Sequence, residues 1–179
     1  MFADETINNL LLKISSGNSV LGDYCIDIIE GIVAHKELIG EKPLTNSYPL
    51  IEGKAISRFG KLTANKFIIW DKKKIHRARP DYLWEASKKI VLQRISGGNL
   101  PLTATIDTDK YKTFASVNNI ILKEQYHNYY ENILALLNSK VLNWFYANSF
   151  SNNSTLTVNI SKTFLEKLPI VLGTEMQRN

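Results

Sequence analysis

The residues best suited to bind a charged ligand lie in one short segment, 72–80, with the sequence Lys-Lys-Lys-Ile-His-Arg-Ala-Arg-Pro. Its flanking patterns predict a loop between a strand and a short helix. Lysine contacts phosphate as a point charge, whereas arginine can donate two hydrogen bonds to guanine O6 and N7. Such a loop can contact a nucleic-acid backbone and also read a base; an ordinary solvated surface loop is the alternative. The candidate contacts are Lys72, Lys73, Lys74, His76, Arg77 and Arg79.

Four further candidates lie outside this loop. Arg94 and Ser96 stand where an apolar, β-branched run breaks into Gly97-Gly98. Because glycine allows a backbone to approach DNA closely, both residues are candidate contacts, with a structural ion pair as the alternative for Arg94. Lys54 and Arg58 are four residues apart, so a single helical turn would present both on one side. The equally open alternative is that they are surface residues on a turn.

Positive charge is concentrated in the same part of the chain. The 179 residues include 22 lysines and arginines against 17 acids, a net charge of +5 that a solvated surface explains without any partner. Residues 54–94, however, hold twelve of the basic residues and only three acids. A nucleic-acid footprint requires this kind of clustering, so the position of the charge is more informative than its sum.

The single cysteine, Cys25, excludes an internal disulfide and a cysteine-based zinc site. It lies in an apolar run at 25–29, which predicts a small buried side chain rather than a reactive thiol. A lone cysteine is typical of a reducing compartment, so we expect a cytoplasmic protein. No apolar run approaches the ~18 residues of a membrane-spanning helix. The acidic start at residues 3–5 does not resemble a secretory signal, and no membrane partner is expected.

The elements that would position these residues are strands in the first two-thirds and helices toward the end. This order predicts an α+β fold with a mixed, mostly antiparallel sheet and helices at the N-terminus and toward the C-terminus. A first helix, capped by Asp4 or Thr6, would carry an apolar stripe from Ile7 to Ile14. Segment 126–150 has helical spacing, with cap-type residues at Asn138-Ser139 that suggest two helices meeting at a bend.

The remaining expectations follow from alternation, proline and glycine. Pro80 begins a short helix through residue 87, and Ser161 caps a last helix that ends at Pro169. Loops are expected at 34–48, 71–79 and 151–154, and a turn at 107–110. Strands are expected at 49–51, 66–70, 89–95, 102–106, 114–122 and 156–160, with a strand or bent hairpin at 21–33.

Catalytic motifs are nearly absent from the sequence. There is no glycine-rich phosphate loop, and the three histidines form no His-Glu-x-x-His motif. One alternative function is a small metal-dependent nuclease, because Asp81, Glu85 and Lys88 are loosely similar to a PD-(D/E)xK motif. The spacing departs from that motif, since both acids lie on one short helix. There the helix dipole favours acids in the first turn and explains them fully.

A second alternative is a protein-interaction module that docks through the aromatic helical segment 126–150. Its aromatic residues recur at helical spacing, which favours packing in the core or against a partner over the stacking of bases. They are Tyr126, Tyr129, Tyr130, Trp144, Phe145 and Tyr146.

Several short motifs follow one another in a set order. They are Pro49 to Phe59, with a Gly-x-x-Ile-x-Arg-Phe turn after Pro-Leu-Ile; the strand Phe67–Trp70 with Arg77–Pro80; Gln93–Gly97; Ser116–Ile120; Leu136–Lys140; and Phe164–Ile170. In this order the chain resembles the C-terminal specificity domain of TaqI-like adenine methyltransferases and fused restriction–modification enzymes. It also resembles one half of a type I restriction specificity subunit. The resemblance covers roughly residues 20–170.

The resemblance implies a target-recognition domain that grips double-stranded DNA while a separate methyltransferase domain flips and methylates adenine. It implies no catalytic residue, metal or cofactor in this chain, because S-adenosylmethionine would bind the separate domain. The Asn/Asp-Pro-Pro-Tyr/Phe motif that holds the flipped base is missing here, in keeping with this division. We therefore expect residues 1–179 to form a single domain with a core at about 20–170. We also expect this domain to be a fragment of a longer enzyme. Its expected partners are duplex DNA and a methyltransferase domain of the same or a partner chain.

Overall fold

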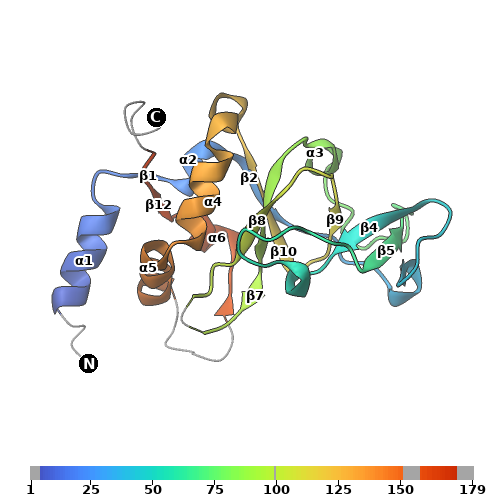
Figure 1. The fold of residues 1–179 in the computed structure, drawn as a ribbon, viewed down its shortest axis with the longest axis horizontal. Helices are drawn as coiled ribbons and strands as arrows, with labels where there is room; N and C mark the ends of the chain where they lie inside the picture. Colours follow the sequence, from blue (N-terminus) through green and yellow to red (C-terminus); the bar gives the residue numbers. More distant parts are fainter. Residues whose placement is uncertain (1–4, 99, 151–157, 173–179) are drawn as a thin grey trace.

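A four-stranded antiparallel sheet forms the centre of the structure, a computed structural model that describes residues 5–98, 100–150 and 158–172. The order of its strands is β2-β10-β6-β8. Figure 1 shows this sheet between a helical end and a smaller sheet at the opposite end. The four strands are β2 (Cys25–Glu30), β10 (Val117–Leu122), β6 (Lys89–Gln93) and β8 (Ala104–Asp107).

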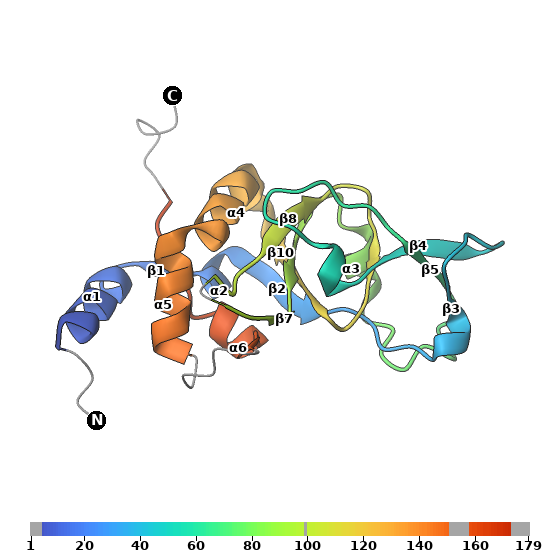
Figure 2. The same ribbon diagram turned by 60° about the horizontal axis from the view of Figure 1, so that its bottom comes forward.

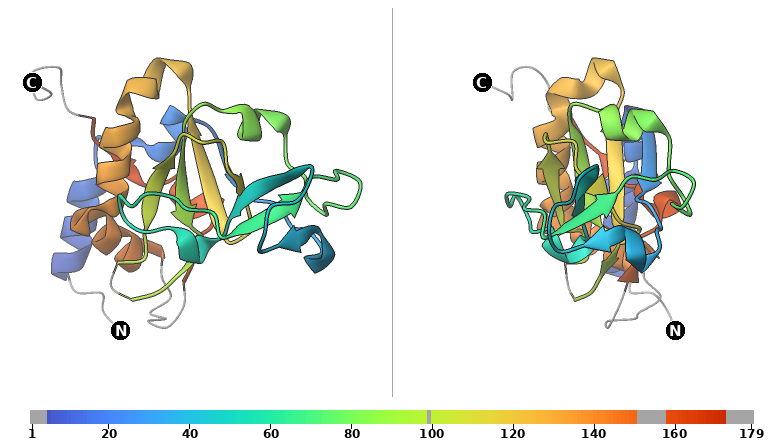
Figure 3. Two further views of the ribbon diagram at one scale, coloured as in Figure 1. Left: turned by 45° about the vertical axis from the view of Figure 1, so that its right-hand side comes forward. Right: turned by 90° about the vertical axis from the view of Figure 1, so that its right-hand side faces the viewer.

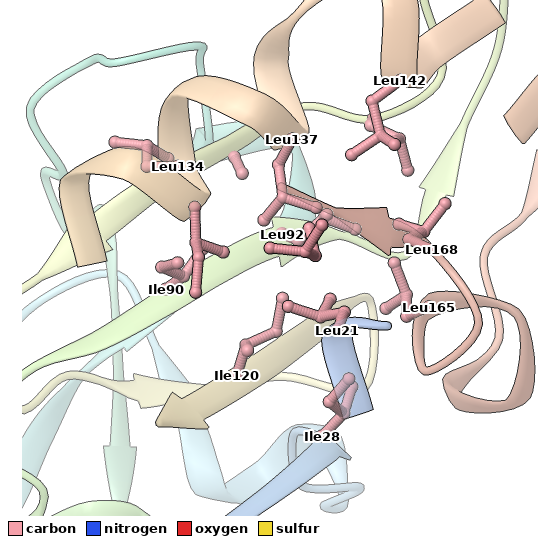
Figure 4. Close-up of a cluster of buried hydrophobic side chains, with 14 of the residues drawn as sticks. Leu21, Ile28, Ile90, Leu92, Ile120, Leu134, Leu137, Leu142, Leu165 and Leu168 are labelled. Atoms are coloured by element: carbon pink, nitrogen blue, oxygen red, sulfur yellow. The ribbon is translucent and has the colours of Figure 1, made fainter. Parts of the chain in front are cut away.

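Alternate residues of the central strands enter different parts of the core, as the two-residue period of a strand requires. Ile90 and Leu92 of β6 face the largest cluster of buried side chains, whereas Val91 packs on the other side of the sheet. Figure 4 shows Ile90, Leu92 and Ile120 of the sheet together with Leu134 and Leu137 of the covering helix. Both faces of the sheet are covered, so β10 is buried along its whole length.

Helices α1 (Glu5–Ser15), α4 (Tyr130–Asn138) and α5 (Lys140–Phe150) gather at one end of the molecule (Figure 1). The break between α4 and α5 is made by Asn138 and Ser139. The Asn138 amide donates to and accepts from the main chain of Ala104, both at 3.0 Å, as a neighbouring strand would. Asn143 accepts the N–H of Leu102 at 2.7 Å. One asparagine side chain therefore pairs with the open edge of β8 and a second with the segment just before it, which fixes the helices to the sheet.

A second four-stranded sheet extends from the opposite end (Figure 2). Its order is β3-β5-β4-β9, and its β4–β9 pair is the parallel one. The strands are β3 (Ile39–Gly40), β5 (Lys66–Ile69), β4 (Ser47–Ile51) and β9 (Lys112–Thr113). Ile68 and Leu50 from this sheet join Ile32, Leu83 and Ile121 in a second core cluster, so the small sheet and the central sheet share buried side chains.

Short elements complete the fold. Two-stranded pairings join β1 (Ser19–Val20) to β12 (Pro169–Ile170) and β7 (Ile95–Ser96) to β11 (Val158–Asn159). The remaining helical turns are α2 (Leu21–Tyr24), α3 (Asp81–Glu85), α6 (Lys162–Leu165), η1 (Lys36–Leu38), η2 (Gly53–Ala55) and η3 (Glu124–Tyr129). Among the described residues, no helix combines the length and apolar character that a bilayer crossing needs.

The structure confirms the α+β class, the mostly antiparallel pairing, the bend after Asn138 and the Ser161 cap, whose Oγ accepts the N–H of Phe164. The first helix also forms as expected, although none of its residues is fully buried. Its expected cap Asp4, the loop 151–154 and residues 156–157 of the expected last strand lie outside the described residues.

Several expected boundaries are wrong. Residues 21–24 form a helical turn rather than a strand, because Leu21 and Gly22 donate to carbonyls of the 166–168 segment and Asp23 accepts the N–H of Val20. Part of the expected loop 34–48 is ordered as η1 and β3, since β5 offers an unpaired edge to Ile39. Pro80 precedes α3 as its N-cap rather than occupying its first turn.

The expected strands 89–95 and 114–122 are each interrupted. At Arg94 the main-chain N–H donates to Ser116 and the carbonyl accepts from Ile160, so the chain leaves the central ladder there. The expected strand 114–122 is shortened to β10. The N–H of Phe114 donates to the carbonyl of Ile51 in the smaller sheet, so this residue does not join the central ladder. The expected turn at 107–110 is confirmed, with Asp107 Oδ1 accepting the N–H of Asp109 at 2.9 Å and Lys110 at positive φ.

Candidate nucleic-acid interface

The basic loop, residues 71–80, connects β5 to α3 and is held by main-chain hydrogen bonds. Asp71 accepts the N–H groups of Lys74 and Ile75, both at 3.0 Å, and the carbonyl of Val33 accepts from His76 and Arg77. Ile75 is the buried residue of the loop and pairs with Ala34 through an isolated bridge. This apolar anchor leaves exposed the three lysines before it and His76 and Arg77 after it. Figure 3 (left) shows the loop as a green segment projecting at the small-sheet end.

Three arginines converge on one carboxylate, that of Glu30 at the end of β2. Arg77 Nη1 lies 2.6 Å and Arg79 Nη2 lies 2.5 Å from Oε1, while Arg94 Nη1 lies 3.1 Å from Oε2. We call this group the arginine cluster. It joins two residues of the basic loop to Arg94, which directly follows β6. One acid against three guanidinium groups leaves the cluster with a net positive charge, so it can attract an anionic partner.

The three arginines are held to different degrees. Arg79 also donates to the carbonyl of Gly31 at 3.2 Å, and Arg94 donates to that of Ala115 at 3.2 Å. Their side chains are 18% and 29% exposed, whereas that of Arg77 is 57% exposed. Burial raises the pKa of Glu30, but the hydrogen bond from Arg79 and the charges of Arg94 and Arg79 outweigh it and hold that pKa below its usual value.

A second group of candidates lines an open recess of about 500 Å³ beside the loop. Lys73, Lys74 and His76 contribute to it from the loop, and His35 and Glu37 from the segment before β3. The rings of His35 and His76 lie 6.3 Å apart, centroid to centroid. Two lysines and two imidazoles around one hollow offer donors to an acidic group, in particular a phosphate.

The other predicted residues lie apart from these two groups. Lys72 is bound to Asp81, with Nζ 2.6 and 2.8 Å from the two carboxylate oxygens. Lys54 is exposed and lies 3.4 Å from Glu52. Ser96 is half-buried and pairs with Val158 across β7 and β11.

Arg58 supports the main chain of a neighbouring segment. Its guanidinium donates to the carbonyl of Leu100 at 2.5 Å and to that of Leu102 at 3.0 and 3.3 Å. The 3₁₀ turn η2 ends at Ala55, so Arg58 does not share a helical turn with Lys54, and only Lys54 of the two is an exposed surface residue. Arg58 therefore fixes the chain at Leu100–Leu102, ahead of β8.

An aromatic clasp closes the base of the basic loop. Trp70 precedes the loop, Trp84 follows it in α3, and their rings meet edge to face at 5.6 Å. The ammonium group of Lys112 lies 4.4 Å from the ring centre of Trp70 and 5.0 Å from those of Trp84 and Tyr48. Cation–π attraction of this kind is strongest when the cation is desolvated. The clasp, made of Lys112, Trp70, Trp84 and Tyr48, therefore ties both ends of the loop to β9.

The residues of the nuclease alternative do not converge. Asp81 is bound to Lys72, and Lys88 is bound to Glu131 of α4. Within the described part of the chain, no three His, Cys, Asp or Glu side chains are grouped so as to hold a metal ion. The observed partners of Asp81 and Lys88 are those of surface ion pairs.

The aromatic residues at 126–150 mostly serve the core. Tyr130, Phe145 and Tyr146 are buried in the largest cluster, and Tyr130 donates to the carbonyl of Lys88 at 2.8 Å. Trp144 lines an apolar hollow of about 260 Å³ between α5 and α1 together with Leu10, Ile14, Lys140 and Val141. Core packing thus accounts for most of the aromatic pattern.

Sequence reasoning missed Glu30, His35 and Lys112. Glu30 is an acid that closes an apolar strand just before a glycine, a weak local signal for a buried partner. Its partner Arg77 lies 47 residues further along the chain, so the pairing depends on the fold. Lys112 had no signal, because its aromatic neighbours come from three separate segments.

One family model matches the chain, that of the TaqI-like C-terminal specificity domain, over residues 48–170. The matched range holds the basic loop, Arg94 and Lys112, whereas Glu30 precedes it. Among curated proteins, no sequence matches the chain. The family match spans more than half of the sequence. The chain therefore belongs to the TaqI-like C-terminal specificity domain family, and this membership implies DNA target recognition in the context of methyltransferase or restriction–modification enzymes.

Proposed function

We propose that this chain binds duplex DNA in a sequence-specific manner and positions a separate adenine-N6 methyltransferase domain, in a modification or fused restriction–modification enzyme. The observation that carries the proposal is the convergence of Arg77, Arg79 and Arg94 on Glu30, beside the exposed cations of the basic loop. Residues far apart in sequence thereby form one positively charged region. Duplex DNA is the partner that such a region fits best, because its phosphates present closely spaced negative charge.

The ten candidate residues divide by exposure into two proposed roles. The half-buried side chains hold the loops that meet DNA; they are Arg58, Arg79, Arg94 and Ser96. The exposed side chains reach the DNA itself, and the lysines among them position the duplex by its phosphates. They are Lys54, Lys72, Lys73, Lys74, His76 and Arg77. Base readout would require contact in the major groove, for which Arg77 has the appropriate forked donor group.

The chemistry belongs to a separate domain in this proposal. S-adenosylmethionine binds there, and the target adenine leaves the duplex to enter that domain. This chain supplies recognition as one module of a longer cytoplasmic enzyme. Support comes from the family match, and from the absence in the sequence of both a glycine-rich phosphate loop and the adenine-methyltransferase motif.

A binding titration tests the proposal. A fluorescent duplex pool with a randomised centre is selected on the chain, and the enriched sequence is compared with a scrambled one by anisotropy. If about five phosphates are neutralised, the affinity falls about five-hundredfold between roughly 50 and 200 mM salt. The enriched duplex should bind more tightly than the scrambled one at every salt concentration. Binding that is salt-insensitive, or equal for the two duplexes, would contradict the proposal.

A further inference from the structure

We propose that Glu30 and Arg77 form an exchangeable pair: Glu30 holds the Arg77 guanidinium in the free protein, and a phosphate of duplex DNA takes Arg77 from it on binding. Arg79 and Arg94 stay on Glu30 throughout. Glu30 is then a positioning residue that sets how readily the basic loop engages DNA. This inference rests on the proposed function, because it assumes that the loop meets a duplex.

Arg77 is the most weakly held member of the arginine cluster. Within the described residues, the hydrogen bond from Nη1 to Glu30 Oε1 is the one that its guanidinium makes. Its side chain is also the most exposed of the three, so its other nitrogens can reach a ligand from the solvent side. Because the Arg77 side of this ion pair is exposed, we expect the pair to shift an equilibrium by only about fivefold, which a DNA phosphate can overcome.

Arg79 and Arg94 are held more firmly than Arg77. Arg79 donates to a main-chain carbonyl and to the carboxylate, and Arg94 donates to a main-chain carbonyl and forms an ion pair with the carboxylate, so each is fixed at two points. Arg79 also has φ of 62°, in the left-handed region, which shows that the loop is bent to bring this side chain inward. The main chain turns at Arg79 after presenting Arg77 to solvent.

The carboxylate of Glu30 keeps two partners when Arg77 leaves it. Oε1 keeps Arg79 at 2.5 Å, and Oε2 keeps Arg94 at 3.1 Å. A carboxylate stripped of every partner would cost far more to leave half-buried. The exchange therefore moves one guanidinium from a carboxylate to a phosphate without leaving an unpaired charge behind. Glu30 acts in the free protein as an internal substitute for the phosphate.

A double-mutant cycle tests this exchange. Binding to the fluorescent enriched duplex is measured for wild type, Glu30→Gln, Arg77→Gln and the double variant, by anisotropy at fixed salt. Glu30→Gln should tighten binding about threefold, because Arg77 is released from its competitor. The same substitution should give no comparable gain when Arg77 is already glutamine.

The matched control is Glu131→Gln on α4. It makes the same change in net charge, at an ion pair with Lys88 near the surface. Any long-range effect of charge appears in both variants and is subtracted. A gain for Glu30→Gln that equals the gain for Glu131→Gln, or that persists in the Arg77→Gln background, would overturn the exchange while leaving DNA binding intact. Failure of the wild-type chain to bind any duplex would instead reject the proposed function, and the inference with it.

A second measurement needs no Glu30 variant. The Nε–H signals of the three arginines are assigned in ¹⁵N spectra by single Arg→Lys substitutions, and the duplex is then added to saturation. The Arg77 signal should move, while those of Arg79 and Arg94 stay in place. An unmoved Arg77 signal, or equal movement of all three, would show that Glu30 does not exchange Arg77 selectively.

Discussion

Lys89 and Asp107 lie directly opposite each other in the antiparallel pairing of β6 and β8, and their side chains form a fully buried ion pair, with Nζ 2.7 Å from Oδ2. Lys89 Nζ also donates to the carbonyl of Tyr111 at 3.1 Å, and Asp107 Oδ1 accepts the N–H of Asp109 at 2.9 Å. The pair therefore fixes the turn that leads from β8 to Lys112. It connects the central sheet to the clasp at the base of the basic loop.

Breaking this pair on one side should destabilise the fold severely. Burial lowers the pKa of Lys89, and the charge of Asp107 opposes that shift, so Asp107→Asn leaves an ammonium group buried without its counter-charge. We expect a loss of about 3–5 kcal/mol in the free energy of unfolding, measured by urea titration. The double variant Lys89→Met with Asp107→Leu should recover most of it. Equal losses for the single and double variants would show that packing, not charge, decides the site.

The aromatic clasp should stabilise the loop through the charge of Lys112. Lys112→Met keeps most of the side-chain volume but removes the ammonium from the faces of Trp70 and Trp84. We expect the free energy of unfolding to fall by about 1–2 kcal/mol. DNA affinity should fall as well, because the ends of the loop loosen. The control is Lys61→Met at an exposed position. A stability change no larger than that of the control would exclude a role for the cation.

Local signals allowed much of the fold to be predicted. The break between α4 and α5 falls at Asn138-Ser139 because asparagine and serine bond readily to nearby backbone groups, and Ser161 caps α6 for the same reason. Runs of apolar, β-branched residues marked β6 and β10. These features depend on neighbours within a few residues, so they can be predicted from the local sequence.

The organisation of the site could not be predicted in the same way. The sequence marks Arg77 and Arg94 as cations, but their shared partner Glu30 is joined to them only by the fold. Arg58 has the same residue type and turns out to bind main-chain carbonyls, because the chain at Leu100–Leu102 passes beside it. Which arginines are fixed and which are exposed depends on contacts across separate strands.

Cys25 should behave as an inert thiol in the folded protein. Burial, and to a smaller extent the carboxylate of Glu166, raise the pKa of Cys25 from 9.0 to about 12. Alkylation by iodoacetamide near neutral pH should be at least roughly a hundredfold slower than in the urea-unfolded chain, since the thiolate is the reactive form. Comparable rates in the two states would contradict the buried position.

The same thiol contributes to alkaline unfolding. Its pKa is raised in the folded state, so its contribution to stability is full below about pH 9 and is lost as the pH rises toward 12. The stability difference between wild type and Cys25→Ala should therefore change in favour of the variant across this range. The measurement is urea unfolding at a series of alkaline pH values, and a constant difference would contradict it.

Glu30 should contribute to stability at neutral pH and lose that contribution in acid. Burial raises its pKa, but the hydrogen bonds and charges of Arg79, Arg94 and Arg77 together outweigh burial and depress the pKa in the folded state. The stabilisation is therefore present above the unfolded value of 4.5 and disappears as the pH falls through the folded pKa. Glu30→Gln should be less stable than wild type at neutral pH, and the two free energies of unfolding should converge in acid. A gap that is unchanged down to about pH 3 would contradict the ion pairing.

The lysines of the basic loop should act through phosphates rather than bases. Lys73→Ala and Lys74→Ala each remove one exposed ammonium from the recess beside His76, without removing a buried contact. Because each phosphate contact releases about one counterion, each variant should reduce the slope of log affinity against log salt by about one. The loss should be the same for the enriched and the scrambled duplex, since phosphates carry no sequence information. Lys13→Ala, on the exposed surface of α1 at the helical end, is the control and should leave the slope unchanged. A slope that falls equally in the control, or a loss confined to the enriched duplex, would show that the loop lysines do not make the phosphate contacts.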